Sequence, residues 1–403
     1  MNILQVSDVS ISKVIGGAER VLFEQSTRLS RRGHRVFVLT RRLHCHNLER
    51  EIIQGAEEWR YPISESNPAA FLYSTCRAGK RLFEGLEQSI GFDCIQFHQP
   101  FSALGVLLSK RSRKKRKIYT CHSLSFEEFL SRNARPFSIK EKSLYFLHVL
   151  ARRFIEQQVL KFSDRILVLS RFTREKVMSA HGVPSSRLTL LPGGVDLLRF
   201  HPKPDKWRLR EKLGVPVNKV IALTIRNLVP RMGLENLISA IGLIAEQTPE
   251  LHLIIGGSGP LENDLKKRIQ NLALDEKISL SGFIPETDLP DYYRTADMFV
   301  LPTRELEGFG LVTIEAMASG LPVLGTPVGG TQEILGDVAP EWLFQSASPG
   351  DMAALILKAY QTIQSAPDQW RLLGQRCRLH VQTHYNWETH IDVLEQLMES
   401  QPS

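Results

Sequence analysis

The feature of this sequence that most limits its fold is a repeated alternation of short apolar runs with helix-patterned stretches. The apolar runs are rich in Val, Ile and Leu along their whole length, which is typical of strands covered by helices on both faces. Between them lie stretches such as 16–33 and 231–247, whose apolar residues are spaced three and four apart. This alternation predicts an α/β fold with doubly wound, mostly parallel sheets.

The apolar runs fall into two series. The first comprises 2–8, 35–40, 94–98, 117–122, 165–170 and 187–192, and the second comprises 219–225, 251–257, 277–282, 298–302 and 322–326. Gly and Pro cluster between the two series, over 193–207. We therefore expect an N-terminal Rossmann-like domain over 1–195, a linker over 196–207 and a C-terminal Rossmann-like domain over 208–380. Residues 381–403 are expected to form a helical tail.

Several classes of protein are excluded by local features of the chain. No run approaches the ~18 apolar residues that a membrane span requires. The first ten residues lack the basic segment of a secretory signal. The five cysteines, Cys45, Cys76, Cys94, Cys121 and Cys377, are scattered and form no C-x-x-C pair. They indicate reduced thiols and a cytoplasmic location.

Positive charge is concentrated in the first half of the chain. Residues 1–196 contain 32 Lys and Arg against 18 Asp and Glu, although the net charge of the whole chain is only +8. Such asymmetry implies an anionic partner: nucleic acid, an anionic membrane face or a phosphate-bearing ligand. Because no nucleic-acid motif with interleaved aromatic residues is present, we expect no nucleic-acid partner.

Two segments bear on membrane attachment. Residues 110–117 contain seven basic residues in eight, and 139–161 is a basic and apolar helical stretch. The basic run is either a solvated loop or a contact with an anionic membrane face, where each Lys or Arg contributes about 1 kcal/mol. The helical stretch is either packed core or part of the same peripheral attachment.

The most informative motif is PTRELEGFGLVTIEAMASGLPVLGTPVGG, residues 302–330. It predicts a strand, a loop ending at Glu307, and a helix that is opened by Gly308-Phe309-Gly310 and continues to about Ser319. The amides of Gly310 and Leu311 would then be exposed at a helix N-terminus, which is a natural binding site for a diphosphate.

Two glutamates flank this predicted anion site. Glu307 and Glu315 are eight residues apart, or about 12 Å along an α-helix. That separation matches the distance between the sugar ring and the ribose of a nucleotide-sugar, and carboxylates accept hydrogen bonds from sugar hydroxyls. The alternative is that Glu307 is a helix cap and Glu315 a solvated helix residue.

The complete motif resembles the nucleotide-sugar signature of glycosyltransferase family 4, whose members are retaining enzymes of the GT-B fold. The resemblance implies two Rossmann-like domains facing a central cleft. It implies that Glu307 contacts the transferred sugar together with Gly308, Phe309 and Gly310. It also implies that Glu315 binds the ribose hydroxyls.

Further segments resemble the same family. IGGAER (15–20) resembles its first glycine loop, in which Gly16 and Gly17 would bring amides to the donor diphosphate or to the acceptor. Residues 191–200 resemble its interdomain segment. In the stretch 280–303 the resemblance implies that the backbone of Gly282, Phe283 and Ile284 contacts the nucleotide base.

Two histidines end neighbouring strands of the predicted first domain. His122 follows the strand 117–122, and His98 follows 94–98. Carboxyl ends of strands face the ligand crevice in such sheets, and the resemblance places His122 opposite the donor sugar. His98 is the weaker candidate, and the alternative for both is a core histidine.

The cations expected around the diphosphate are displaced in this chain. The family usually has an Arg and a Lys where this sequence has Asn227 and Met232, while Arg226 and Arg231 each lie one residue away. A leaving diphosphate gains negative charge, so a cation is needed. We expect Arg231 to supply it, with Arg226 and Asn227 as further diphosphate contacts. Arg226 is the less secure, because one step along a strand reverses side-chain direction.

Together these features predict a retaining hexosyltransferase that uses a nucleotide diphosphate sugar, such as GDP-mannose or a UDP-sugar, and a glycan or lipid-linked acceptor. We expect Glu307, His122 and Arg231 to be catalytic. No D-x-D stands at a strand end near the donor site, so we expect no metal and no other cofactor. The alternatives are a nucleotide-sugar epimerase on the same fold and a non-catalytic nucleotide-sugar-binding protein.

Overall fold

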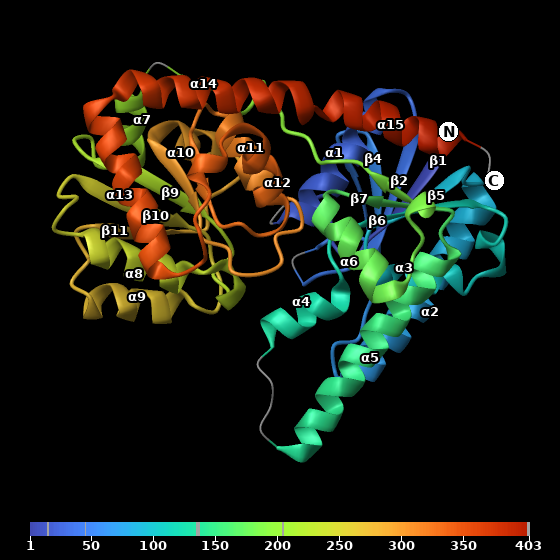
Figure 1. Ribbon diagram of the computed structural model, residues 1–403. Coiled ribbons are helices and arrows are strands. Elements are labelled where there is room, and N and C mark those ends of the chain that lie inside the picture. Colours follow the sequence, from blue (N-terminus) through green and yellow to red (C-terminus); the bar gives the residue numbers. More distant parts are fainter. Residues whose placement is uncertain (14–15, 45, 134–137, 204, 401–403) are drawn as a thin grey trace. The chain divides into compact units, whose positions relative to one another are not determined.

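The computed structural model describes residues 1–13, 16–44, 46–133, 138–203 and 205–400 (Figure 1). The chain divides into two compact units. Unit 1 contains Met1–Pro192 and the residues from Trp387 onward, and unit 2 contains Gly193–Asn386. The last helix, which we expected in a separate tail from residue 381, therefore belongs to unit 1.

Unit 1 is built on an eight-stranded sheet with the order β3-β4-β2-β1-β5-β6-β7-β8. All neighbouring strands are parallel except β3 and β4. The strands are β1 (Asn2–Val6), β2 (Arg35–Arg41), β3 (Arg50–Ile53), β4 (Ala56–Tyr61), β5 (Cys94–Phe97), β6 (Arg116–Cys121), β7 (Arg165–Val168) and β8 (Leu188–Leu190). The six expected strands are present, and β3 and β4 were not predicted.

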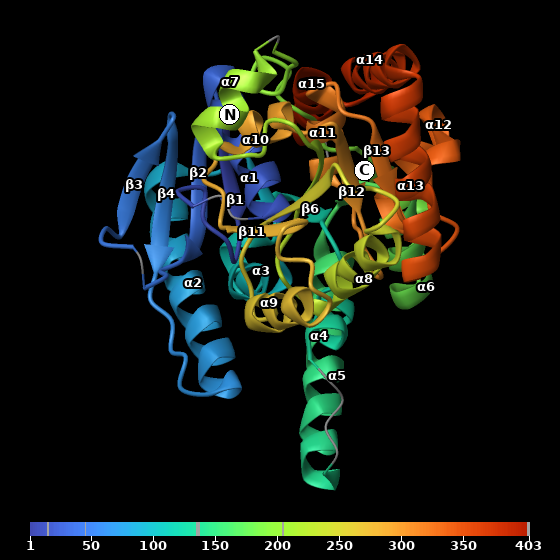
Figure 2. The same cartoon turned by 90° about the vertical axis from the view of Figure 1, so that its left-hand side faces the viewer.

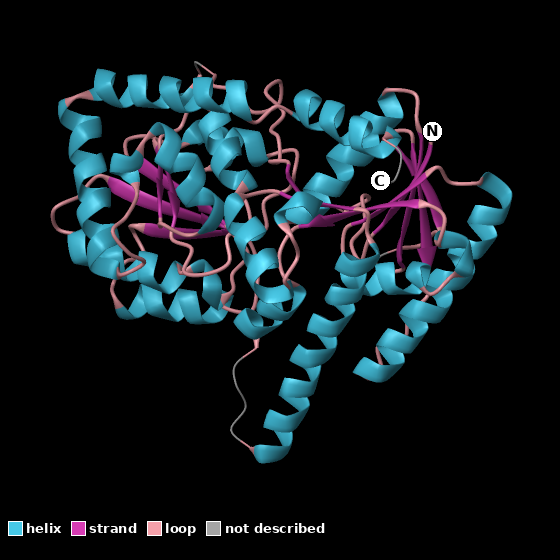
Figure 3. Ribbon diagram, turned by 45° about the vertical axis from the view of Figure 1, so that its right-hand side comes forward, coloured by secondary structure: helices cyan, strands magenta, loops and turns pink. Residues whose placement is uncertain are grey.

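Helices cover both faces of this sheet (Figure 3). They are α1 (Gly17–Arg31), α2 (Pro68–Ile90), α3 (Pro100–Leu107), α4 (Ser125–Arg132), α5 (Ile139–Phe162), α6 (Arg171–His181) and α15 (Trp387–Glu399), with short 3-10 turns η1 (Lys110–Ser112) and η2 (Ser185–Arg187). Ile391 and Leu394 of α15 join the apolar core formed with Leu22 and Leu29 of α1. The C-terminal helix thus completes one face of the unit 1 sheet.

Unit 2 has a five-stranded, all-parallel sheet with the order β11-β10-β9-β12-β13. Its strands are β9 (Val220–Ile225), β10 (Leu251–Gly256), β11 (Ile278–Gly282), β12 (Met298–Leu301) and β13 (Val323–Gly325). Its helices are α7 (Lys206–Leu213), α8 (Leu234–Ile244), α9 (Glu262–Asn271), α10 (Leu289–Thr295), α11 (Leu311–Ala318), α12 (Gly329–Val338), α13 (Pro349–Ser365) and α14 (Pro367–His384), with turns η3 (Pro230–Met232) and η4 (Pro340–Trp342). Every strand of the second predicted series is confirmed.

Each sheet has a position at which the strand order reverses. In unit 1 it lies at β1, which is flanked by β2 and β5, and in unit 2 at β9, which is flanked by β10 and β12. Ligands of open α/β sheets bind outside the carboxyl ends of the strands at such positions. Asp8 and His98 follow β1 and β5, and Arg226 and Thr303 follow β9 and β12.

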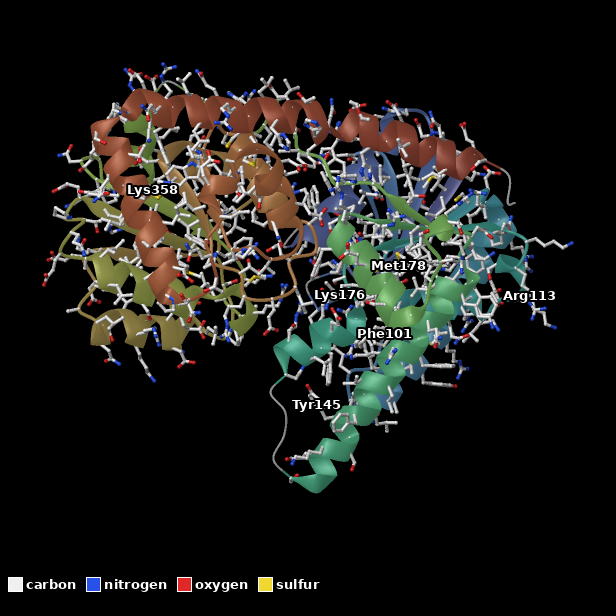
Figure 4. All side chains as sticks on the ribbon, viewed as in Figure 1. Phe101, Arg113, Tyr145, Lys176, Met178 and Lys358 are labelled. Carbon is white, nitrogen blue, oxygen red and sulfur yellow. The ribbon has the colours of Figure 1, made fainter. Side chains whose placement is uncertain are left out.

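The basic run 110–117 has two parts, one that is bound to the rest of unit 1 and one that is exposed to solvent. Lys115 pairs with Glu87 at 2.7 Å, Arg116 Nε donates to the Leu397 carbonyl at 2.6 Å, and Lys117 Nζ donates to three backbone carbonyls. Lys110, Arg111, Arg113 and Lys114 are exposed, and Figure 4 shows Arg113 directed away from unit 1. Only the first part of the run is therefore a solvated surface, because the last two residues begin strand β6.

In the part of the chain that the structure describes, no helix is both long and apolar enough to cross a membrane. The same residues contain no group of three or more His, Cys, Asp or Glu arranged to hold a metal ion. Four of the cysteines are free thiols, and the fifth, Cys45, lies outside the described residues.

Candidate active site

Glu307 lies at the position in unit 2 where the strand order reverses. The loop after β12 carries it, and its side chain is buried, with the residue only 8% exposed. Its Oε2 accepts hydrogen bonds from Thr303 Oγ1 at 3.1 Å and from Arg226 Nη2, with which it forms an ion pair. Because Arg226 follows the adjacent strand β9, neighbouring strand ends bring together a carboxylate and a guanidinium.

Arg226 points into this site, whereas its neighbour Asn227 is exposed. Besides Glu307, Arg226 Nη2 contacts Thr303 Oγ1 at 2.8 Å and Met232 Sδ at 2.9 Å. Successive side chains of an extended segment point to opposite sides. Arg226, and not Asn227, is therefore the residue whose charge lies in the site. Met232, which occupies the family's lysine position, instead packs against that arginine.

Arg231 supports the loop that carries Glu307. It lies in η3, and its Nη1 donates to the Leu306 carbonyl at 2.8 Å. Its own carbonyl accepts the N–H of Arg304, also at 2.8 Å. Leu306 has a positive φ of 56°, a conformation that a residue with a side chain rarely adopts unless surrounding contacts hold it. The Arg231 guanidinium therefore lies directly beside the backbone of the candidate site.

Two glycines allow close backbone contacts around this loop. A Cβ on Gly329, whose φ is +59°, would lie 1.9 Å from the Glu307 carbonyl oxygen. A Cβ on Gly233, whose φ is +71°, would lie 2.0 Å from the Pro302 carbonyl oxygen. The N–H of Gly330 also donates to the Glu307 carbonyl at 3.0 Å. The position of Glu307 thus depends on glycine at residues distant from it in sequence.

Helix α11 begins at Leu311, later than predicted. Gly310 precedes it in a left-handed conformation with φ 93°. Because 307–310 is not helical, the helical-rise estimate of about 12 Å between Glu307 and Glu315 does not apply. Within the described chain, no residue accepts a hydrogen bond from the backbone N–H of Gly310 or Leu311. These amides lie at a helix N-terminus, and their binding of an anion stays a prediction.

Glu315 is buried, which excludes its interpretation as a solvated helix residue. It is 6% exposed, and its Oε2 accepts a hydrogen bond of 3.0 Å from the hydroxyl of Tyr293 in α10. Burial raises the pKa of Tyr293 well above its usual value, so the hydroxyl keeps its proton and remains a donor. Sequence reasoning did not identify Tyr293, because a tyrosine in a short helix is also an ordinary core residue.

The segments expected around the base and the sugar contribute mainly backbone. The Gly282 carbonyl accepts the N–H of Gly257 at 2.7 Å. Ile284 is buried, whereas Phe283 is 55% exposed. The Phe309 ring is buried against Tyr385 at 5.6 Å. The Phe309 ring is therefore a core side chain, and the contact of residues 308–310 with a sugar stays a prediction.

In unit 1, His98 and His122 are in direct contact. His98 Nδ1 lies 3.1 Å from His122 Nε2, and the rings stack with centroids 5.4 Å apart. Burial lowers the pKa of His122 to about 4, and that of His98 well below its usual value. Both imidazoles are therefore neutral near pH 7. In the described part of the chain, His98 Nε2 and His122 Nδ1 are buried without a hydrogen-bond partner.

The predicted first glycine loop lies at the start of α1. Gly16 immediately precedes the helix and Gly17 begins it, while Ile15 lies outside the described residues. Glu19 reaches back to the backbone N–H of Gly16, and burial raises the pKa of this glutamate. Glu19 occupies the third helical position, where acidic residues commonly cap a helix. The amide of Gly16 thus already has an acceptor within the protein.

Comparisons with known proteins define the class of the molecule. It aligns with sucrose-phosphate synthase from Thermosynechococcus elongatus with a TM-score of 0.79, 24% identity and 98% coverage of both chains. It also aligns with the catalytic domain of starch synthase IV from Arabidopsis thaliana with a TM-score of 0.74, 17% identity and 98% coverage of both chains. The predicted fold is therefore confirmed: the molecule has the GT-B architecture of glycosyltransferases.

The family follows from sequence comparison. Residues 205–370 match the family described as glycosyl transferases group 1, and residues 15–199 match the family described as glycosyltransferase family 4. The chain belongs to glycosyltransferase family 4.

Curated relatives share part of this chain. Mannosylfructose-phosphate synthase from Agrobacterium fabrum is 32% identical over 263 residues, which cover 63% of this chain and 51% of the relative. The GDP-mannose-dependent alpha-(1-6)-phosphatidylinositol monomannoside mannosyltransferase of Mycolicibacterium smegmatis is 36% identical over 182 residues, which cover 43% of this chain and 47% of the relative. The chain thus spans about half the length of these relatives, and neither of them is named as an epimerase.

Proposed function

We propose that this protein is a retaining, metal-independent glycosyltransferase. It would transfer a hexose-type sugar from a nucleotide diphosphate sugar to an acceptor hydroxyl, in the synthesis of a glycan, polysaccharide or glycolipid. The observation that carries this proposal is the buried Arg226–Glu307 pair at the carboxyl ends of β9 and β12. Family membership supports the same reaction class.

The donor diphosphate would lie at the N-terminus of α11. The amides of Gly310 and Leu311 would donate to its oxygens, and the helix dipole would favour its negative charge. As the glycosidic bond breaks, charge accumulates on the leaving diphosphate, and Arg226 and Arg231 would stabilise it. These two cations would provide the charge stabilisation that a metal ion supplies at other phosphate sites.

We propose the remaining donor contacts for side chains and backbone near this helix. Glu307 would accept a hydrogen bond from the transferred sugar, and Glu315, oriented by Tyr293, would bind the ribose. The backbone of 282–284 would meet the base. The Mycolicibacterium smegmatis relative is named as GDP-mannose-dependent, so GDP-mannose is the first donor to test and UDP-sugars the second.

His122 would act as a neutral hydrogen-bonding group for the donor sugar. Its low pKa and its unpartnered Nδ1 favour this role over that of a charged acid. Attack by the acceptor on the same face as the leaving diphosphate would give retention. The protein's contribution would then be positioning and electrostatic stabilisation.

Matched variants in one loop test the proposed function. Glu307→Gln should lower transfer from the best donor by about 100-fold or more, whereas Glu305→Gln, at an exposed position of the same loop, should keep wild-type turnover. A thermal-shift panel of GDP- and UDP-sugars would first identify the donor. Wild-type turnover in Glu307→Gln would refute the site.

Two outcomes would instead support the alternative functions. A donor that is isomerised without any acceptor, as followed by NMR, would identify an epimerase. Tight donor binding with neither transfer nor hydrolysis would identify a binding protein.

We also propose peripheral attachment to an anionic membrane face through α5, which extends away from the sheet of its own unit (Figures 1 and 2). Leu144, Phe146, Leu147, Leu150 and Phe154 are each more than half exposed, and their spacing places them on one side of the helix. Burying each in a bilayer would contribute about 1.5–3 kcal/mol, and exposed basic residues of the same helix would add attraction to anionic lipid.

Vesicle sedimentation tests this surface. The double variant Leu147→Asp, Leu150→Asp should lose binding to vesicles that contain phosphatidylglycerol. Leu243→Asp, which alters an equally exposed leucine of unit 2 (61% exposed), should bind as wild type. Equal binding by both variants would exclude α5 as the attachment surface.

A further inference from the structure

Glu156 and His181 form a buried pair that the proposed reaction does not use. Glu156, in α5, is fully buried, and the side chain of His181, the last residue of α6, is 1% exposed. Glu156 Oε2 lies 3.1 Å from His181 Nε2. The ring of Phe126, in α4, contacts the imidazole edge-on, with centroids 5.9 Å apart. The pair therefore lies where α4, α5 and α6 of unit 1 meet (Figure 1).

The second oxygen of the Glu156 carboxylate binds the start of α4. Glu156 Oε1 accepts the backbone N–H of Ser125 at 3.0 Å. Ser125 is the first residue of α4, so its N–H has no acceptor inside the helix. A carboxylate at this end of a helix is also favoured by the helix dipole. Glu156 thus satisfies the N-terminus of α4 from a neighbouring helix.

Helix α4 begins close to His122 in the chain. Strand β6 ends one residue before His122, and α4 begins at Ser125, three residues after it. Within this link the Ser123 hydroxyl donates to Glu128 of α4. A displacement of the α4 N-terminus would therefore be passed on to His122 through very few backbone torsions. Displacement of a reacting or contacting group by about 1 Å can lower a rate by about 100-fold.

The Glu156–His181 pair is a poor source of stability by itself. Burial raises the pKa of Glu156, because a charge is costly at this place. Replacing a buried pair of this kind by apolar residues of similar volume is often neutral or stabilising. An apolar pair, however, would leave the Ser125 N–H without an acceptor. The specific contribution of Glu156 is therefore a fixed acceptor for the backbone beside His122.

We propose that Glu156, held by His181, is a positioning residue for His122. It fixes the N-terminus of α4, and with it the short link that presents the His122 imidazole to the donor sugar. Both side chains of the pair are buried, so they act through the backbone of Ser125 and not by contact with a ligand. This inference rests on the proposed function, because it takes from it the role of His122.

The variant Ser125→Pro removes the N–H and leaves Glu156 and His181 in place. Proline is tolerated at the first position of a helix. Leu124, with a ψ of 120°, already has the extended conformation of a residue before proline. The kcat of Ser125→Pro should be about tenfold or more below that of Ser125→Ala, which keeps the N–H. The KM for the donor should differ by less than about twofold, since the lost positioning acts in the transition state.

Variants of Glu156 test the acceptor itself. Glu156→Leu should lower kcat as Ser125→Pro does. Glu156→Gln should keep most of the wild-type kcat, because the amide oxygen still accepts the Ser125 N–H while the amide nitrogen donates to His181. Glu175→Leu, at an exposed position of α6, should have wild-type kinetics. If Glu156→Leu fails to fold, Ser125→Pro and Glu156→Gln still decide the question.

Proton–nitrogen correlation spectra of the histidine side chains give a readout that does not depend on transfer. The signals that disappear in His122→Asn identify His122. Burial lowers the pKa of His122 to about 4. In Ser125→Pro this pKa should rise toward the ordinary value of about 6.5, because a displaced link admits water to the imidazole. In Glu175→Leu it should be the same as in wild type.

The outcomes separate this inference from the proposed function. Unchanged kcat together with unchanged His122 signals in Ser125→Pro would overturn the inference. A loss of kcat without any change in the His122 signals would also overturn it, because the effect would then arise elsewhere in the fold. If the wild-type protein transfers no sugar, the proposed function fails, whereas the spectra still test whether Glu156 positions His122.

Discussion

The two sheets place their candidate residues after the carboxyl ends of neighbouring strands, β9 and β12 in unit 2 and β5 and β6 in unit 1, but with different chemistry. In unit 2, Arg226 and Glu307 are oppositely charged, buried, and bonded to each other and to Thr303. In unit 1, His98 and His122 are neutral, and each has a buried nitrogen without a partner in the described chain. The unit 2 carboxylate and guanidinium are thus bonded to each other, although Arg226 Nε, like one nitrogen of each histidine, is buried without a partner in the described chain.

This difference suggests how the two sites are used. A closed charge pair holds its geometry before a ligand arrives, which is the preorganisation that electrostatic stabilisation requires. Unpartnered atoms impose less geometry and can accept ligands of different shape. We therefore expect substitutions in the unit 2 site to affect both folding and chemistry, and those in the unit 1 site to affect mainly ligand binding and pH response.

The largest effect is expected for Arg226→Ala. It leaves the Glu307 carboxylate buried without its counter-charge, so the free energy of unfolding should fall by about 3–5 kcal/mol and transfer should be lost. In the double variant Arg226→Ala, Glu307→Gln, part of the stability should return but not the activity. Urea unfolding and a transfer assay measure both quantities. If the single and double variants were equally unstable, the pair would not be coupled.

The next largest effect is expected for Gly329→Ala. Its Cβ would collide with the Glu307 carbonyl, so the free energy of unfolding should fall by about 1–3 kcal/mol. The rate of transfer should fall by more than the loss of folded protein explains. The control is Gly336→Ala in the same helix, where a Cβ meets nothing within 4 Å and should stabilise by about 0.4–1 kcal/mol. Similar thermal unfolding of the two variants would contradict the close contact.

A smaller effect is expected from the pH dependence of the histidine pair. Burial lowers the pKa of His122 to about 4, so the unfolded chain binds a proton more readily than the folded one. The stabilisation is complete above pH 6.5 and is lost as the pH falls toward 4, with a slope of at most about 1.4 kcal/mol per pH unit for one group. Urea unfolding at pH 7 and pH 5 measures this effect. The free energy of unfolding of His122→Asn should depend less steeply on pH than that of wild type. His44→Asn, at an exposed side chain, should not differ from wild type.

The smallest effect is expected for Tyr293→Phe. This change removes the hydrogen bond to Glu315, which contributes about 1 kcal/mol, and should weaken nucleotide binding severalfold without changing the rate at saturating donor. Tyr292→Phe, at the adjacent position, should bind nucleotide as wild type. Calorimetry with GDP measures the difference, and equal affinities would show that Tyr293 does not orient Glu315 for the ribose.

The strands were predictable because most are continuous apolar runs buried on both faces, such as 94–98 and 298–302. Strand β4 was missed because it contains Glu58 and Arg60, and charged residues hide a buried strand from any hydropathy pattern. These two side chains are buried only because they form an ion pair, and because Ser10 and the backbone N–H of Ile11 donate to Glu58. The start of α11 was misplaced because Gly310 takes a left-handed conformation that residue type alone permits but does not require.

Local patterning was sufficient to locate the strands, the loop of Glu307 and the histidines at the strand ends, because each depends on the composition of a single segment. It could not tell that Arg226 faces Glu307, that Tyr293 holds Glu315, or that α15 packs on unit 1. Each of these contacts joins segments far apart in the chain, and their adjacency follows from strand order and from which helix covers which face. The motif at 302–330 could therefore be identified from the sequence alone, whereas the partners of its charged side chains were determined by the packing of the fold.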